Sequence, residues 1–254
     1  MGNSFSVDGM RYLYDVARSE GKRLLLGNLY IGGCSLERHF SNTQTGAPDY
    51  IYYKNTDGGW TERPGSTLLD GLTDEDWDVI TTQQCSGLSG LPESYSPYLD
   101  RLIEFLRENA PKSGFKLGWQ MTWAYSKDSD HPEFPNYGRD QEKMYRAICE
   151  AVKEKILSRP DFDLIIPTGS AIQLAREGVI GDNLNRDGFH LNKLGRFIAG
   201  MTWYKALTGQ DVKDPAAPED IELPQATLKA AAEAACGAFA RFEKDAGLPI
   251  GKNT

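Results

Sequence analysis

A hydroxyl near one end of the chain and an imidazole–carboxylate pair near the other have the chemistry of a nucleophilic site. Ser4 lies in the segment GNSFS, directly before an amphipathic run, and His190 lies in NRDGFHLNKLG with Asp187 three residues before it. In a serine-dependent site, a base accepts the hydroxyl proton and a carboxylate fixes the tautomer of that base. The sequence therefore offers Ser4, His190 and Asp187 as nucleophile, base and orienting acid.

Each of these residues also has a purely structural interpretation. A serine that begins a helix commonly caps it through its side-chain oxygen, and Asp187 is placed to cap the last helix of an α/β domain in the same way. Of the three histidines, His131 lies in the turn-rich segment DSDHPEFP and is predicted to be a solvated loop residue. His39, in SLERHF, is predicted to be structural or a contact at the rim of a site.

Acyl transfer further needs hydrogen-bond donors for the developing oxyanion. Backbone N–H groups are offered by Ser4 and by Gly32 or Gly33, where the missing side chain permits close approach. A side-chain amide is offered by Gln83 or Gln84, which follow a predicted strand. Gln83 is the preferred donor, and a structural hydrogen bond is the alternative for both.

Strands that alternate with amphipathic helices must position these groups. The patterning predicts helices at about 7–20, 96–110, 139–157, 170–177, 191–209 and 225–245, and strands at about 22–33, 79–83, 115–125 and 162–169. This alternation predicts an α/β fold with a parallel sheet covered on both faces, whose ligands bind beyond the carboxyl ends of the strands. Residues 49–66 are predicted to form a hairpin insertion.

Composition narrows the classes of partner. A net charge of -8 with no Lys/Arg block argues against nucleic acid, and no apolar run reaches the ~18 residues of a membrane span. Four cysteines stand far apart without a C-x-x-C pair, so neither a zinc site nor a disulfide framework is predicted. The location is left unassigned: the sequence as written shows no leader and would be cytoplasmic, and a secreted or periplasmic location is the alternative if a leader precedes Met1.

The order of four segments, GNSFS, IGG, TTQQCSG and RDGFHLN, resembles that of the SGNH, or GDSL-like, hydrolase superfamily. GGCSLERH, WDVITTQQCSG, TWAY and RDGFHLNKLGRFIAG are similar to a functionally uncharacterised bacterial branch of it. The resemblance covers about residues 1–210, and residues 211–254 are left as a linker and a C-terminal helix. It implies a flavodoxin-like three-layer α/β/α fold, catalysis by Ser4, His190 and Asp187, and no metal or organic cofactor.

Two features depart from the superfamily pattern. The third segment, TTQQCSG, which we call the third block, lacks the Gly-x-Asn-Asp of the superfamily and has Gln83 and Gln84 instead. Some carbohydrate esterases of the superfamily also have Gln in this block. The nucleophile block normally follows a central strand, whereas here only Met1 precedes Gly2, so the first strand is expected to be truncated. Loss of a central strand leaves two unpaired edges. We therefore expect the 254-residue chain to fold poorly or to bind partners through that gap.

Aromatic rings near the strand ends suggest the substrate. Trp123 and Tyr125, with His39 at the rim, are predicted to contact a sugar, although core packing is the alternative for each ring. The leading prediction is a serine esterase that hydrolyses an O-acyl, for example acetyl, ester of a carbohydrate or another small molecule. The rival is a non-catalytic glycan-binding domain that retains the fold, which the altered third block favours. A lipase or thioesterase is disfavoured, because a tunnel for an acyl chain needs apolar walls and the loop at 128–130 is polar. The sequence assigns no oligomeric state.

Overall fold

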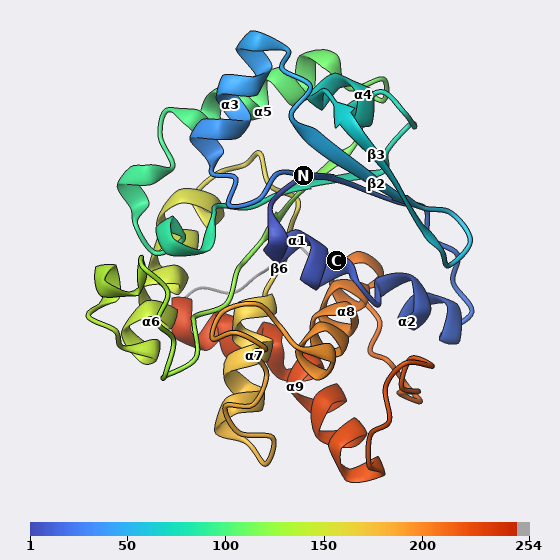
Figure 1. Cartoon of the computed structure of the whole chain (residues 1–254), viewed down its shortest axis with the longest axis vertical. Coiled ribbons are helices and arrows are strands. Elements are labelled where there is room, and N and C mark those ends of the chain that lie inside the picture. Colours follow the sequence, from blue (N-terminus) through green and yellow to red (C-terminus); the bar gives the residue numbers. More distant parts are fainter. Residues whose placement is uncertain (248–254) are drawn as a thin grey trace.

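The computed structural model describes residues 1–247 as a mixed α/β protein with two three-stranded sheets (Figure 1). One sheet is antiparallel, in the order β1-β2-β3, and the other is parallel, in the order β4-β5-β6. The strands are β1 (Leu26–Tyr30), β2 (Tyr50–Asn55), β3 (Trp60–Ser66), β4 (Val79–Thr82), β5 (Lys116–Gln120) and β6 (Leu164–Ile166).

Two groups of helices lie on opposite sides of the strands in Figure 1. The first group packs α3 and α4 against α5, and the second packs α1, α2, α7 and α9 around α8, with α6 against α9. The helices are α1 (Ser4–Met10), α2 (Leu13–Ser19), α3 (Leu36–Thr45), α4 (Leu68–Leu72), α5 (Tyr98–Asn109), α6 (Gln141–Val152), α7 (Thr168–Glu177), α8 (Lys193–Thr208) and α9 (Gln225–Ala246). Short 3₁₀ turns cover Ser86–Leu88, Pro92–Ser94 and Phe134–Tyr137, and a π turn covers Lys153–Leu157.

Local capping explains where several helices begin. The Ser35 hydroxyl accepts a hydrogen bond from the backbone N–H of Arg38 at the start of α3, and Asn192 does the same for Gly195 at the start of α8. Asn192, and not Asp187, therefore caps α8. The helix predicted at 7–20 is divided into α1 and α2, because Arg11 N–H bonds to the carbonyl three residues back and the helical ladder resumes only from Tyr12.

The single parallel sheet expected from the alternation of strands and helices is not what the structure has. The β2–β3 hairpin, predicted as an insertion at 49–66, pairs antiparallel with β1, and β1 makes no ladder with β4. Met1 and Gly2 lie between these two strands. Gly2 forms a parallel bridge with Tyr30 of β1, and the Met1 amino group donates to the Thr81 carbonyl of β4 at 2.8 Å.

Helix α9 packs against α7 and α8, which also form its nearest helical neighbours in Figure 1. Within residues 1–247, no helix combines the length and the apolar character needed to cross a membrane.

Candidate active site

Ser4 and His190, 186 positions apart in the sequence, meet in a hydrogen bond. The distance from Ser4 Oγ to His190 Nε2 is 2.7 Å, and that from His190 Nδ1 to Asp187 Oδ2 is 2.6 Å. The Asp187 carboxylate can only accept when ionised, so the ring proton lies on Nδ1 and Nε2 is left to accept the Ser4 hydroxyl proton. The arrangement is that of a serine nucleophile with an oriented base.

The environment of Asp187 keeps it in the charged form. Burial raises the pKa of this carboxyl. The hydrogen bonds from the His190 ring and from the backbone N–H groups of Phe189 and His190 lower it by a larger amount, so the resulting pKa lies below the ordinary value. An anion therefore faces His190 Nδ1 at neutral pH, which is the environment that favours a protonated imidazole.

A tight turn carries the imidazole to this place. Gly188 has φ +85°, and a Cβ there would approach the Ser129 backbone to 3.1 Å, so the turn requires glycine. The Gly188 carbonyl accepts from Ser126 N–H at 2.8 Å, and the Phe189 carbonyl accepts from the Trp123 indole N–H at 2.8 Å. The loop after β5 thus fixes the turn that presents His190.

Asp8 holds the other side of the same turn. Its side chain is 1% exposed and accepts from both Arg186 and Arg196, as well as from the backbone N–H of Leu191 at 2.8 Å. Because Asp8 lies one helical turn after Ser4 on α1, this cluster ties α1 to the residue after His190. Neither the arginines nor Asp8 stood out in the sequence.

Asn3 is a second residue that the motif analysis did not single out. Its Oδ1 accepts from the backbone N–H of Phe5 at 3.0 Å and from Gln83 Nε2 at 2.9 Å, and its Nδ2 donates to the Cys34 carbonyl at 3.0 Å. Asn3 is therefore the N-cap of α1, a role that the sequence had offered to Ser4. It also links the nucleophile to the segments that follow β1 and β4.

The residues predicted to supply backbone oxyanion donors border the same cavity. Ser4 begins α1, and Gly32 and Gly33 follow β1; all three residues line one cavity of about 440 Å³. Gly33 has φ +62°, and both glycines are exposed. Within residues 1–247, no hydrogen-bond acceptor engages the N–H groups of these three residues. The structure thus brings to one cavity the three residues whose N–H groups the sequence offered as oxyanion donors.

The two glutamines do not supply a free amide to this cavity. Gln84 Oε1 accepts from Leu36 N–H and Cys85 N–H, and its Nε2 donates to Ser94, so its side chain is wholly structural. Gln83 Nε2 donates its hydrogen bond to Asn3, while the buried Gln83 Oε1 has no partner within the described residues. Neither glutamine lines the cavity, whereas Cys85 and Ser86 of the same block do.

The residues predicted to contact substrate are in the core. Trp123 and Tyr125 are fully buried, with Trp123 stacked on Phe5 at 4.1 Å between ring centroids and the Tyr125 hydroxyl bonded to Ser86. His39 is also fully buried and bonds to the Tyr50 hydroxyl at 2.9 Å; burial lowers its pKa to about 3. The prediction that Trp123, Tyr125 and His39 contact substrate is therefore wrong, because all three side chains are packed in the core and none lines the cavity.

Other aromatic residues form the walls of the cavity. Tyr30 and Tyr53 are half-buried neighbours on β1 and β2, with ring centroids 5.8 Å apart. Phe189 and His131 also line the cavity, with ring centroids 4.6 Å apart. His131 lies in a loop, as its sequence context predicted, but it is partly buried against the cavity, and this burial lowers its pKa.

The thiols near the site are poor nucleophiles. Burial raises the pKa of Cys85 to about 11 and that of Cys34 to about 12, which keeps both protonated at neutral pH. In the described part of the chain, no group of three or more His, Cys, Asp or Glu side chains is arranged to hold a metal ion.

Comparison with known proteins gives one family and one solved structure. The model of DUF4886, described as a domain of unknown function, matches residues 1–237. A crystal structure of a DUF4886 family protein from Bacteroides uniformis is similar to this chain at 43% sequence identity and a TM-score of 0.89. The match covers 94% of this chain and 92% of that one. None of the curated proteins matches.

Proposed function

We propose that this chain, which belongs to the DUF4886 family, is a serine hydrolase of the SGNH type that cleaves O-acyl esters of carbohydrates. The observation that carries the proposal is the contact of Ser4 Oγ with His190 Nε2 at 2.7 Å, backed by Asp187. The proposal includes the three-layer α/β/α arrangement of that superfamily, with the helix groups on either side of the strands as its outer layers.

In the proposed reaction, Ser4 Oγ attacks the ester carbonyl while His190 Nε2 takes the hydroxyl proton. Negative charge moves to the carbonyl oxygen, where the N–H groups of Ser4, Gly32 and Gly33 are available as donors. The C–O bond to the alcohol then breaks, His190 returns its proton to that oxygen, and the acyl group stays on Ser4. A water molecule, deprotonated by His190, releases the acid and restores the hydroxyl.

The walls of the cavity support a ring-shaped, hydroxyl-rich substrate. Tyr30 and Tyr53 offer apolar faces of the kind on which the C–H groups of a sugar pack. Glu133 also lines the cavity, and within residues 1–247 no hydrogen bond or ion pair occupies its carboxylate, which leaves it as an acceptor for sugar hydroxyls. A cavity of about 440 Å³ is within the range of small-ligand sites.

The test is covalent labelling combined with turnover. We expect a fluorophosphonate probe to label the protein and Ser4→Ala to abolish labelling, while Ser41→Ala, at an exposed position on α3, labels as the parent does. Hydrolysis of 4-nitrophenyl acetate should fall by a factor of about 10⁵–10⁶ in Ser4→Ala, the scale found when a catalytic serine is removed from other hydrolases. A folded parent that neither labels nor hydrolyses the ester would refute the proposal.

One observation favours the rival, a glycan-binding domain that retains the fold without turnover. The Gln83 amide is held by Asn3, so the cavity lacks the side-chain oxyanion donor that the third block was expected to supply. Loss of one such donor typically costs about 3 kcal/mol of transition-state stabilisation. Glycan binding that is unchanged in Ser4→Ala and His190→Ala, with no ester hydrolysis by the parent, would select this rival.

A further inference from the structure

Two arginines line the cavity at Ser4, and a single carboxylate faces them both. Arg186 precedes the turn that carries His190, and its backbone N–H donates to the His190 carbonyl at 2.9 Å. Arg196 lies in the first turn of α8. Both guanidinium groups donate to Asp8, so the cluster carries one net positive charge at the wall of the cavity. We call Arg186 and Arg196 the arginine pair.

Asp8 does not use all the hydrogen-bond donors of the arginine pair. Arg186 donates through Nη1 to Asp8 and to the Leu191 carbonyl, and Arg196 donates to Asp8 through Nε and Nη2. Within residues 1–247, no acceptor engages Arg186 Nε, Arg186 Nη2 or Arg196 Nη1. Because both side chains are partly exposed and line the cavity, these donors remain for an acceptor that enters it.

The buried carboxylate fixes where the arginine pair lies relative to the nucleophile. The Asp8 side chain is 1% exposed and also accepts from the Leu191 N–H at 2.8 Å. Asp8 follows Ser4 on the same helix by four residues, which is a rise of about 6 Å along the axis of α1. The positive charge is therefore held about one helical turn from Ser4, a separation of the order of one sugar ring.

The other acidic side chain of the cavity lies on a different wall. Glu133 lines the cavity, and its backbone N–H donates to His131 Nδ1 at 3.2 Å. The Glu133 carboxylate lies over the 3₁₀ turn Ser86–Leu88, where a Cβ at Gly87 would collide with Glu133 Oε2. An anionic group is therefore repelled at this wall and attracted at the arginine pair, which gives a bound anion one orientation.

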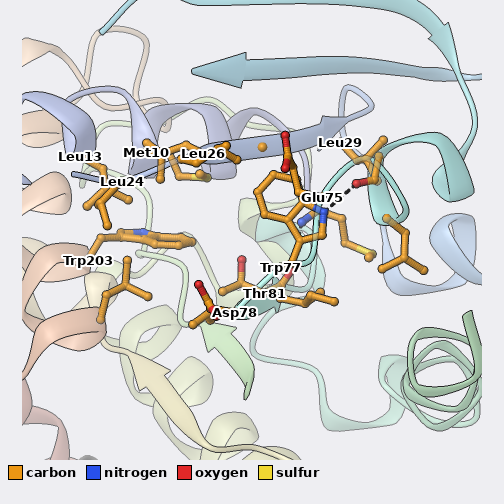
Figure 2. A pocket seen from close by; sticks show the side chains of 18 of the residues that line it. Met10, Leu13, Leu24, Leu26, Leu29, Glu75, Trp77, Asp78, Thr81 and Trp203 are labelled. Atoms are coloured by element: carbon orange, nitrogen blue, oxygen red, sulfur yellow. Dashed lines mark hydrogen bonds between the residues drawn. The ribbon is translucent and has the colours of Figure 1, made fainter. Parts of the chain in front are cut away.

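A second cavity has the opposite balance of charge. It has a volume of about 470 Å³, lies between β1 and β4, and shares no lining residue with the cavity at Ser4. Figure 2 shows Glu75 and Asp78 beside the apolar side chains of its wall. Among the described residues that line it, three acidic side chains, Glu75, Asp76 and Asp78, outnumber Arg23. An anionic ligand is therefore expected in the cavity at Ser4 and not in this one.

We propose that the arginine pair binds an anionic group of the substrate, so that the ester cleaved at Ser4 belongs to an acidic sugar that carries a carboxylate. This inference rests on the proposed ester hydrolysis and names its substrate class. A carboxylate presents two oxygens that match the planar fork of a guanidinium group. One net positive charge suits a single carboxylate, whereas a phosphate monoester carries a charge of about −1.5 to −2 at pH 7.

Binding of ester-free sugars to the parent protein tests the inference without turnover. The ligands are the methyl glycosides of glucuronic and galacturonic acid, each compared by isothermal titration calorimetry with its neutral counterpart, methyl glucoside or methyl galactoside. We expect at least one acidic glycoside to bind at least about tenfold more tightly than its counterpart. This preference should shrink when the ionic strength is raised from about 0.01 M to about 1 M. Equal binding within both pairs would overturn the proposal.

Substitution of one arginine locates the preference. Arg186→Gln should reduce it to less than about twofold, and Arg186→Lys, which keeps the charge but not the fork, should retain part of it. The control is Arg101→Gln, which removes an exposed arginine of α5 outside the cavity and should keep the full preference. A full preference in Arg186→Gln would overturn the proposal. If that variant does not fold, the salt dependence of the parent decides, because a preference that salt leaves unchanged does not arise from the arginine pair.

Two further outcomes separate the alternatives. Tighter binding of methyl galactoside 6-sulfate than of the galacturonic acid glycoside would overturn the assignment of a carboxylate. A protein that prefers acidic glycosides but is not labelled by the fluorophosphonate probe would retain the anionic subsite and lose the proposed hydrolysis. A protein that hydrolyses 4-nitrophenyl acetate but shows no preference would lose the subsite alone.

Discussion

The Asp8 carboxylate provides the sharpest test of how the structure holds its candidate catalytic residues. It is 1% exposed and receives hydrogen bonds from two arginines and from Leu191 N–H. Asp8→Asn keeps the shape and one accepting oxygen but removes the charge. Two guanidinium groups then lose the anion that neutralises them.

The magnitude follows from the exposure of the three partners. Removing one member of a fully buried ion pair typically costs 3–5 kcal/mol. The Arg186 and Arg196 side chains are 40% and 23% exposed, so water screens part of the loss. We therefore expect Asp8→Asn to lower the free energy of unfolding by about 2–3 kcal/mol. For a chain of this size the corresponding fall in Tm is about 4–12 °C.

The two substitutions at this position should differ in activity. Asn can still accept from Leu191 N–H, so the turn that carries His190 stays in place and kcat falls less than about tenfold. Asp8→Ala leaves that N–H without an acceptor and loosens the imidazole, for which we expect a loss of about 100-fold in kcat.

Thermal unfolding followed by circular dichroism, together with 4-nitrophenyl acetate hydrolysis measured well below Tm, distinguishes these effects. The control is Asp214→Asn, at an exposed position in the linker before α9. If Asp8→Asn melts within 1 °C of the parent (well inside the roughly 2 °C that 1 kcal/mol would produce), the cluster does not stabilise the fold in the way argued here.

Three further predictions concern the core and the cavity. Burial lowers the pKa of His39 to about 3, whereas an unfolded histidine titrates near 6.5, so the unfolded state binds more protons between these two pH values. The His39 contribution to the free energy of unfolding should therefore be fully present above pH 6.5 and fall with decreasing pH by up to about 1.4 kcal/mol per pH unit. Urea titrations should show that His39→Gln flattens this slope. Tyr53→Ala should raise KM for an acetylated sugar about fivefold with kcat little changed, since a stacking face is worth about 1 kcal/mol; unchanged KM would remove Tyr53 from the substrate site. Asp187→Asn should lower kcat about 10⁴-fold, as in other triads, with Tm nearly unchanged because this side chain is 40% exposed; a comparable Tm loss would indicate a structural role.

Local patterns in the sequence predicted the elements that carry their own signals. The helices α5, α6 and α8 were found because the spacing of apolar residues acts within a few residues. The pairing of β1 with the hairpin, and not with β4, was missed. Strand pairing depends on contacts between distant segments, to which a strand's own composition contributes little.

The candidate site shows the same division between local and distant information. Ser4, Asp187 and His190 carry reactive groups and were recognised by type, order and spacing, and the structure brings them together. Trp123 and Tyr125 were misplaced because an aromatic after a strand has the same sequence signature whether it faces a cavity or the core. Residues that act by holding others were missed, since one carboxylate in a helix carries no sign that two distant arginines converge on it.

Four consecutive residues connect both sheets to the candidate site. Met1 bonds to Thr81, Gly2 bonds to Leu29, Asn3 bonds to Gln83, and Ser4 bonds to His190. These contacts fix the backbone just before Ser4 and limit the freedom of its hydroxyl relative to Gly33 and His190. Positional order of about 1 Å at reacting atoms changes rates by about 100-fold. Loss of these contacts is therefore expected to lower kcat as well as stability, because the same segment bonds to the sheets and carries the hydroxyl.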